Sequence, residues 1–301
     1  MAANGVSAGS LRPHDTVRSA VTALAAAFRE AGIEGPETDA RYLVGGILGL
    51  DGADLITDPD RKIGDAAAGL QDAMRRRLRA EPVSRILGVR AFYGRDFVIS
   101  PAVLDPRPET ETLIDVVLDL ATEHGWHGRP INIADIGTGS GAILLTLIAE
   151  LPGATGVAID ISLPALEVAK ANAERLGVAA RVTFVHTQGL EDVAGPFDLI
   201  VSNPPYIPAT DIAGLDATVR DFDPVLALDG GPDGLTVYRE IASQISRFSG
   251  PMSIVLEVGA GQAEDVAELF SARLGGATKS GIRYRKDLDG HTRCVALQIQ
   301  R

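Results

Sequence analysis

The tetrapeptide Asn203-Pro204-Pro205-Tyr206 carries residue types that could hold a planar nitrogen for chemistry. The Asn203 side-chain oxygen can accept a hydrogen bond from one N–H of an amide, and the backbone carbonyl of Pro204 can accept from the other. Two such acceptors would fix the nitrogen and concentrate electron density on it, by positioning and electrostatics rather than by a strong base. The prolines stiffen the loop, and the Tyr206 ring could pack against the flat acceptor group or contact a cation. The alternative interpretation is a rigid proline turn after a strand.

A second cluster, Asp135-Ile136-Gly137-Thr138-Gly139-Ser140-Gly141, has the composition of a ligand-binding loop between a strand and a helix. Glycines let the backbone approach a ligand closely, and a helix start offers free N–H groups. Asp160 ends the next predicted strand and could accept hydrogen bonds from both hydroxyls of a ribose. This pair is compatible with S-adenosylmethionine and with a nicotinamide dinucleotide, although the glycine spacing departs from G-x-G-x-x-G. The alternative is a tight turn and a helix cap, and Asp135 could hold the turn rather than touch a ligand.

Alternating helices and strands are predicted to position both clusters. After Glu109, strands are predicted at 131–136, 155–159, 182–186, 197–202 and 253–258, with helices between them, notably 163–176 and 235–248. This order predicts an α/β fold with a parallel sheet covered on both faces. Strands 282–285 and 294–299 have no helix between them and predict a final antiparallel hairpin, which is the class I (Rossmann-like) methyltransferase pattern. Ligands bind at the carboxyl ends of such strands, so Asn203 is expected at the same edge as the glycine loop.

The chain is predicted to contain four parts. Residues 1–14 are small and polar and are expected to form a disordered tail. Residues 15–80 predict a small helical domain, with Thr38 and Asp39 capping its second helix and a third helix near 65–79. Residues 81–108 predict a β-hairpin linker, and 109–301 form the α/β domain.

Composition narrows the classes of function. The formal net charge is −12 and Cys294 is the only cysteine, so no internal disulfide and no cysteine-based metal site is expected. A reducing cytoplasm fits, and no apolar run approaches the roughly 20 residues that span a bilayer. Nucleic-acid-binding proteins usually present a basic face, so direct nucleic acid binding is not expected. The one arginine cluster is interpreted as a solvated helix face; it contains Arg75, Arg76, Arg77 and Arg79.

From about residue 38 to its end, the chain resembles the release-factor glutamine N5-methyltransferases, the PrmC/HemK family. The resemblance rests on the glycine loop, the tetrapeptide and several further stretches. The most specific is Pro106-Arg107-Pro108-Glu109-Thr110-Glu111, because DNA adenine methyltransferases share the tetrapeptide. Later matches include Asp233-Gly234-Leu235 and Leu256-Glu257-Val258-Gly259.

The resemblance implies methyl transfer from S-adenosylmethionine to the glutamine of the Gly-Gly-Gln loop in peptide chain release factors. It implies that the helical domain helps to recognise this protein partner. Substrate contacts are implied for Asn203, Pro204, Pro205 and Tyr206. Cofactor contacts are implied for a second set: Gly137, Thr138, Gly139, Ser140, Gly141, Asp160, Gln188 and Asn203.

Three positions depart from the family pattern, and two roles stay open. Thr187 and Gln188 stand where an acidic and then a bulky apolar residue are frequent, and Asp105 stands where an apolar residue is frequent. Arg107 and Glu109 could line the substrate entrance or pin the connector to the main domain.

Other functions compatible with these residues are methylation of a different protein glutamine or of an exocyclic amine in nucleic acid. A non-catalytic module that binds a nucleotide only for folding and a nicotinamide dehydrogenase are further alternatives. The intact Asn203–Tyr206 stretch argues against the non-catalytic module, and the glycine spacing argues against the dehydrogenase.

Overall fold

The computed structural model describes residues 10–274 and 281–299. The chain divides into two compact units, Met1–Gly88 and Val89–Arg301. No helix among the described residues is both long and apolar enough to cross a membrane.

The first unit is a helical domain, as predicted. Its α-helices are α1 Val17–Glu30, α2 Pro36–Leu48, α3 Gly52–Thr57, α4 Ala67–Arg77 and α5 Val83–Leu87. The apolar residues of α1, α2 and α4 meet in one core whose largest members are Leu24, Phe28, Leu43, Leu70 and Met74. This arrangement follows from the apolar face that the spacing of Val17, Val21, Leu24 and Phe28 predicts.

Two boundaries in this unit differ from the prediction. Helix α2 begins at Pro36, with Gly35 as its N-cap, so Thr38 and Asp39 lie inside the first turn and do not cap it. Proline suits the first helical position, because its missing N–H would be unpaired there anyway. Residues 1–9 of the predicted tail lie outside the described residues. The next residues are ordered, because the Leu11 N–H donates to Gln71 and the Pro13 carbonyl accepts from the Gly64 N–H.

The arginine cluster on α4 is largely occupied by ion pairs. Arg75 pairs with Asp72, and Arg76 pairs with Glu81. Arg77 pairs with Asp39 of α2 at 2.7 Å, and both side chains are less than a fifth exposed. The Arg77 pair ties α4 to α2 and the Arg76 pair ties it to the segment after the helix, which is a structural use for two of the four arginines.

The second unit opens with the predicted hairpin. Strands β1 Val89–Phe92 and β2 Arg95–Val98 pair antiparallel around Tyr93 and Gly94. Both turn residues have positive φ, +49° and +71°, as a two-residue hairpin turn requires. The Tyr93 N–H donates to the Glu111 carboxylate at 2.8 Å, which holds the hairpin against the start of α6 (Glu111–His124).

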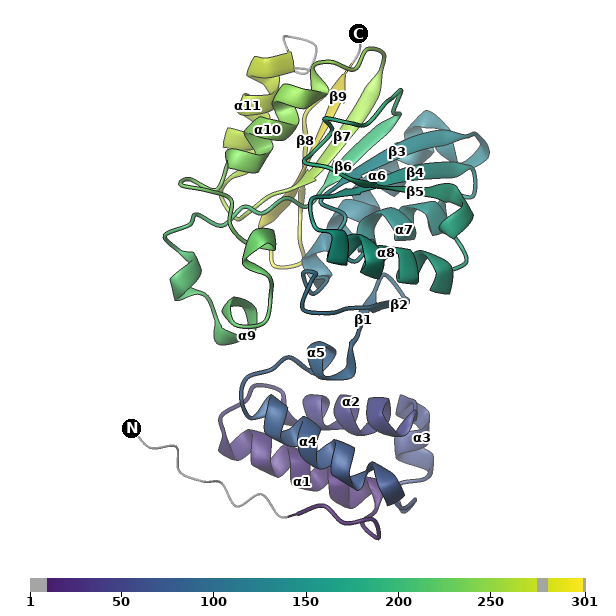
Figure 1. Cartoon of the computed structure of the whole chain (residues 1–301), viewed down its shortest axis with the longest axis vertical. Helices are drawn as coiled ribbons and strands as arrows, with labels where there is room; N and C mark the ends of the chain where they lie inside the picture. The colour runs from purple at the N-terminus through teal and green to yellow at the C-terminus, as the bar shows by residue number, and fades with distance from the viewer. Residues whose placement is uncertain (1–9, 275–280, 300–301) are drawn as a thin grey trace. The chain divides into compact units, whose positions relative to one another are not determined.

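Seven strands among the described residues form one sheet in the order β5-β4-β3-β6-β7-β9-β8 (Figure 1). Strands β3 to β7 are parallel, and β9 runs antiparallel to both β7 and β8. The bounds are β3 Ile131–Ile136, β4 Ala154–Asp160, β5 Val182–His186, β6 Leu199–Ser202, β7 Met252–Glu257, β8 Arg283–Lys286 and β9 Thr292–Ile299. The predicted parallel sheet with a terminal antiparallel hairpin is confirmed.

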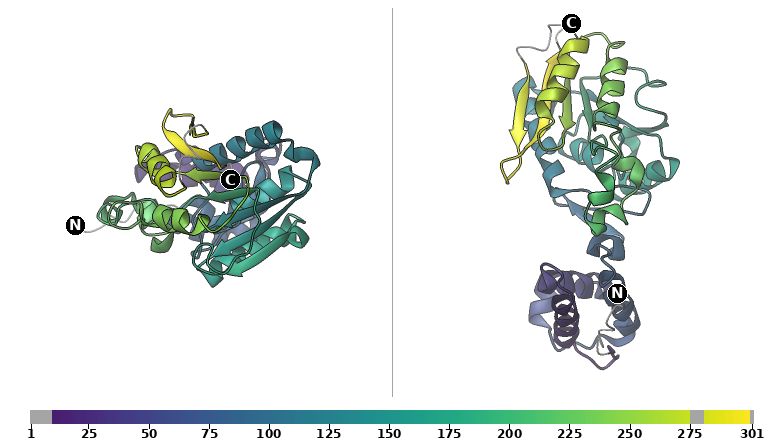
Figure 2. Two further views of the ribbon diagram at one scale, coloured as in Figure 1. Left: turned by 90° about the horizontal axis from the view of Figure 1, so that it is seen from above. Right: turned by 90° about the vertical axis from the view of Figure 1, so that its left-hand side faces the viewer.

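Helices cover both faces of this sheet. Helices α6, α7 (Ala142–Glu150) and α8 (Leu163–Arg175) bury one face, and α10 (Thr236–Ile245) and α11 (Ala263–Leu274) bury the other (Figure 2). Successive strand residues alternate between the two cores: Leu199 and Val201 of β6 pack with α7, whereas Ile200 packs with α10. Between β6 and α10 the chain forms the short helix α9 (Ala217–Arg220). The carboxyl ends of β3, β4, β5 and β6 therefore meet at one edge of the sheet.

Candidate active site

The glycine loop links β3 to α7. Gly137, Gly139 and Gly141 have φ of +72°, +56° and +81°, a region that other residues rarely adopt. The N–H groups of Gly137 and Thr138 each donate to the Ile159 carbonyl at 2.9 Å, which fastens the loop to β4. A Cβ on Gly141 would lie 2.7 Å from a Leu145 methyl group. The spacing of the glycines is therefore a backbone requirement of this turn.

Asp160 stands at the end of β4 and holds the same loop. Its carboxylate accepts from the Gly139 N–H at 2.9 Å and from the Ser162 N–H at 2.8 Å. Burial raises the pKa of Asp160, and these backbone donors lower it. Ser162, rather than Asp160, caps α8, because its hydroxyl accepts from the Ala165 N–H. Asp160 is thus placed to bridge the loop and the adjacent cavity.

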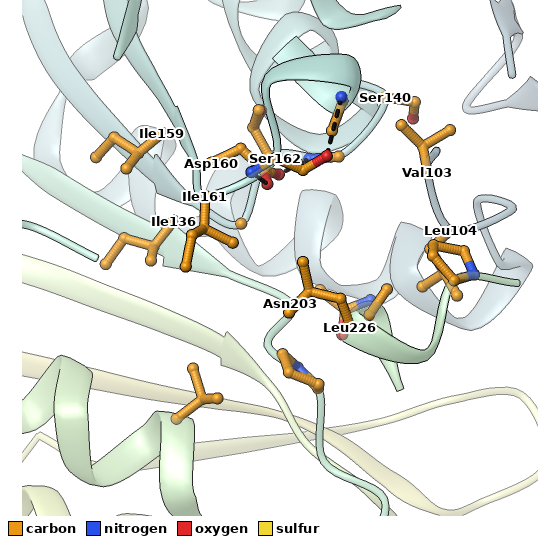
Figure 3. A pocket seen from close by; sticks show the side chains of 18 of the residues that line it. Val103, Leu104, Ile136, Ser140, Ile159, Asp160, Ile161, Ser162, Asn203 and Leu226 are labelled. Atoms are coloured by element: carbon orange, nitrogen blue, oxygen red, sulfur yellow. Dashed lines mark hydrogen bonds between the residues drawn. The ribbon is translucent and has the colours of Figure 1, made fainter. Parts of the chain in front are cut away.

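Asn203 follows β6 and enters the same cavity from the other side (Figure 3). Its side-chain Nδ2 donates to the Thr110 hydroxyl at 3.3 Å. Thr110 lies in the short helical turn Pro108–Thr110, within the Pro106–Glu111 stretch. The buried Glu257 carboxyl is close enough for hydrogen bonding from Thr110 and Asn203 to lower its pKa. The amide of Asn203 is therefore held by the Thr110 hydroxyl, with a buried carboxyl beside the pair.

The other members of the tetrapeptide are placed differently. Pro205 lines the cavity, whereas Pro204 and Tyr206 are not among the described residues that line it. The Tyr206 ring packs against the core of α10 and α11, and burial raises its pKa to about 12. The Tyr206 carbonyl accepts from the Gln262 amide at 3.0 Å. The predicted contact of this ring with the acceptor group or a cation stays a prediction.

The cavity has a volume of about 400 Å³, within the range of small-molecule sites. The glycine loop, Asp160, Gln188 and Asn203 line it together, as the sequence predicted for one sheet edge. Its walls are mainly apolar side chains from several segments, among them Val103, Ile136, Ile159, Ile161 and Leu226. Gln188 donates to the Glu240 carboxylate on α10 at 3.1 Å. No group of three or more His, Cys, Asp or Glu side chains in the described parts of the chain could hold a metal ion.

Residues 19–88 match the PrmC N-terminal domain, and residues 114–219 match the methyltransferase small domain. A Bradyrhizobium diazoefficiens protein named release factor glutamine methyltransferase is 48% identical over 85% of this chain and 87% of its own length. A Rhodospirillum rubrum protein of the same name is 48% identical over 89% of this chain and 80% of its own length.

This chain belongs to the release factor glutamine methyltransferase family. The family resemblance seen in the sequence is confirmed, and the chain is a methyltransferase. The fold has a further parallel in the hMettl16 catalytic domain, solved in complex with the MAT2A 3'UTR hairpin 6. That structure has a TM-score of 0.53 and 16% identity, and the match covers 78% of this chain and 81% of that one.

The family implies an S-adenosylmethionine-type cofactor, and the cavity fits one. A carboxylate can accept about four hydrogen bonds, so Asp160 keeps capacity for hydroxyl donors from the cavity beside its loop contacts. The positive φ of Gly137 and Gly139 brings the backbone to the cavity wall without a side chain. Ile136 and Ile161 supply apolar surface for a planar base.

Asp135 supports the glycine loop of the methyltransferase from beneath. Its Oδ2 accepts from the Thr138 hydroxyl at 2.7 Å, and it does not line the cavity among the described residues. Burial raises the pKa of Asp135 to about 7, with the Thr138 hydrogen bond opposing the shift. This favours the interpretation in which Asp135 holds the turn.

Asp135→Asn is expected to weaken the pH dependence of stability. The folded-state pKa of about 7 lies above the unfolded value, so the stabilisation from the neutral carboxyl is full at low pH and is lost as pH rises toward 7. Asparagine keeps the acceptor for Thr138 and cannot ionise. Urea unfolding of the cofactor-free protein at pH 5 and pH 8 should show a smaller loss in the variant. Equal losses in both proteins would contradict this role of Asp135.

Arg107 both lines the cavity and pins the connector. It pairs with Asp223, whose side chain is 1% exposed and which also accepts from the Asp105 N–H at 3.3 Å. This contact joins the Pro106–Glu111 stretch to the segment between β6 and α10. The charge of Glu109 raises the pKa values of Glu257 and Tyr206.

Arg107→Ala is expected to destabilise the protein by about 1–3 kcal/mol, because it removes a cation that pairs with a buried carboxylate. Arg220→Ala is the matched control, since Arg220 pairs with the neighbouring Asp221 on the surface and should show no measurable change. Thermal and urea unfolding of both variants give the comparison. A similar loss for the two would show that the Arg107 pair adds nothing specific.

Several residues around the site were not found from the sequence as site residues. Thr110 had a signal, because it lies in the most specific stretch of the resemblance. Glu257 lay in a matched stretch, but with no indication of its contact. Glu240, Gln244 and Leu226 had none, because they reach the cavity only through the return of the chain after β6.

Proposed function

We propose that this enzyme transfers a methyl group from S-adenosylmethionine to the side-chain amide nitrogen of the glutamine in the Gly-Gly-Gln motif of peptide chain release factors. The observation that carries the proposal is the anchored Asn203 amide, which faces the same cavity as the glycine loop and Asp160. The names of the relatives support the release factor as the protein partner. The helical unit would help to recognise it. The proposal implies a cytoplasmic enzyme, since protein synthesis takes place there.

Methyl transfer to an amide requires the protein to position a weak nucleophile. An amide nitrogen donates poorly because its lone pair is delocalised into the carbonyl. With Nδ2 of Asn203 turned to Thr110, its Oδ1 can accept one N–H of the substrate amide, and the Pro204 carbonyl can accept the second. The bound cofactor would supply an electrophilic methyl group on a sulfonium and leave as a neutral thioether, and the methylated nitrogen would release one proton to solvent. Holding the nitrogen in line lowers the entropic part of the barrier.

The cofactor would be held by the loop and the adjacent strand ends. Gly137, Thr138, Gly139, Ser140 and Gly141 provide close backbone approach, and Asp160 accepts from the ribose hydroxyls. Gln188 follows β5 and lines the cavity, where it is proposed to contact the adenine. Its hydrogen bond to Glu240 orients its side chain in this position.

The test is transfer of a labelled methyl group to a release factor, with and without a Gln→Ala change in its Gly-Gly-Gln motif. Label is expected only on the protein with glutamine. Equal labelling of the two would overturn the assignment of the target and favour another glutamine. DNA and RNA are included as substrates, and labelling of either would favour an exocyclic amine. The net charge of −12 argues against that outcome.

A further inference from the structure

Behind Asn203 lies a buried carboxyl group that the proposed reaction does not use. Glu257 is the last residue of β7, next to the end of β6, and is 2% exposed. Its Oε2 has no hydrogen-bond partner among the described residues. The Glu257 backbone is held in place, because its carbonyl accepts from the Tyr238 hydroxyl at 2.8 Å. A buried carboxyl with an unpartnered oxygen lowers the stability of the folded protein, so its presence at this position needs an explanation.

The three side chains form a hydrogen-bond chain with a direction. When Glu257 is ionised its carboxylate can only accept, so the Thr110 hydroxyl can donate its one hydrogen toward it, and this contact lowers the pKa of Glu257. The Thr110 oxygen is then an acceptor, and it accepts from Nδ2 of Asn203 at 3.3 Å. This turns the NH₂ end of the Asn203 amide away from the substrate side. Such an assignment of the two ends of an amide rests on the network around it.

We propose that Thr110 and Glu257 are positioning residues, which fix the Asn203 side-chain amide with its oxygen toward the substrate nitrogen. The inference rests on the proposed function, because only an amide or amine substrate needs an acceptor there. With the amide reversed, Asn203 would present a donor to the substrate N–H groups and repel them. The network thus decides whether the site binds the substrate nitrogen or rejects it.

The direction of the chain depends on the ionisation of Glu257. Burial raises the pKa of Glu257 to about 7, while hydrogen bonds from Thr110 and Asn203 and the charge of Arg293 lower it. A protonated Glu257 can donate to Thr110, whose hydroxyl can then donate to Oδ1 of Asn203. That reversal stabilises the wrong orientation, so methyl transfer should decline as pH falls through this pKa. The charges of Glu109 and Arg293 shift the pKa of Glu257. The charge of Glu257 in turn raises the pKa values of Tyr206, Tyr238 and Cys294.

Three variants of the full-length chain test the proposal with a release factor substrate. Thr110→Val keeps the shape and removes the hydroxyl, so kcat should fall about tenfold, the effect of one lost orienting hydrogen bond. Thr110→Ser returns the hydroxyl and should restore most of the rate. Glu257→Gln cannot ionise, so its kcat should be flat with pH, whereas the wild-type kcat should rise between about pH 6 and pH 8. Affinity for S-adenosylhomocysteine, measured by calorimetry, should change less than about threefold in all three.

The outcomes separate this inference from the proposed function. A wild-type enzyme that does not label the release factor refutes the function. A wild-type enzyme that labels it, with Thr110→Val at the full rate, refutes the positioning role alone. An unchanged acid limb in Glu257→Gln does the same. Should Glu257→Gln fail to fold, the Thr110→Val and Thr110→Ser pair still decides, because recovery by serine is not expected of a residue that only fills space.

Discussion

Replacement of Asn203 by alanine is expected to lower kcat for release factor methylation by about 100- to 1000-fold, as loss of one preorganised polar group does at other active sites. The variant loses the oxygen that would accept from the substrate nitrogen, and Thr110 loses its donor. Cofactor affinity should fall by less than about tenfold, because Asp160 and the glycine loop remain. Single-turnover rates with labelled cofactor and calorimetry with S-adenosylhomocysteine measure the two quantities separately.

Asn132→Ala is the matched control for Asn203→Ala. Asn132 lies at the amino end of β3, where its side-chain oxygen accepts from the Thr155 hydroxyl at 2.6 Å, and it is not among the cavity-lining residues. Its loss should leave the rate within about twofold, since distant sites behave independently. Asn203→Ala at more than half the wild-type rate would remove the central residue of the proposed mechanism.

The second large effect is expected on cofactor binding. Asp160→Ala should weaken binding of S-adenosylhomocysteine at least about 100-fold, which corresponds to ~2.7 kcal/mol. Two losses add up: hydrogen bonds from ribose to a carboxylate, each worth about 1.5–3 kcal/mol, and the anchor of the Gly139 N–H that shapes the loop. Calorimetry at constant pH gives the affinity directly, and NAD serves as a ligand that neither protein should bind.

Asp198→Ala provides the comparison for Asp160→Ala. Asp198 also accepts from a backbone N–H, that of Asn132 at 2.9 Å, but does so before β6 and outside the cavity. Its removal should cost some stability and leave cofactor affinity unchanged. If both variants bound with wild-type affinity, Asp160 would be only a structural ligand of the loop.

The sheet could be predicted from the sequence because its strands carry their own signal. Ile131–Ile136 and Val182–His186 were predicted with the observed bounds, because each is a short run rich in apolar and β-branched residues between turns. Only the first is a buried strand, since β5 lies at the end of the sheet and is half-exposed. The start of α2 was predicted wrongly. Thr38 and Asp39 have good capping chemistry, but Gly35 and Pro36 precede them and begin the helix earlier.

Part of the candidate site could also be predicted from the sequence, and part could not. The glycine loop, Asp160 and the tetrapeptide are each contiguous or follow a predicted strand, so the topology alone assigns them to one edge. Two contacts that complete the site join residues far apart in the chain: Asn203 and Thr110 are 93 positions apart, and Arg107 and Asp223 are 116 apart. No local sequence pattern predicts contacts between residues so far apart in the chain.

By itself, the sequence determined the order of strand, glycine loop, acidic residue and Asn-Pro-Pro-Tyr, because backbone conformation and strand burial are short-range requirements that neighbouring residues express. Only the tertiary structure decided which way the Asn203 amide turns. A side-chain amide looks alike at both ends until distant groups offer it a donor or an acceptor, and here those groups are Thr110 and Glu257.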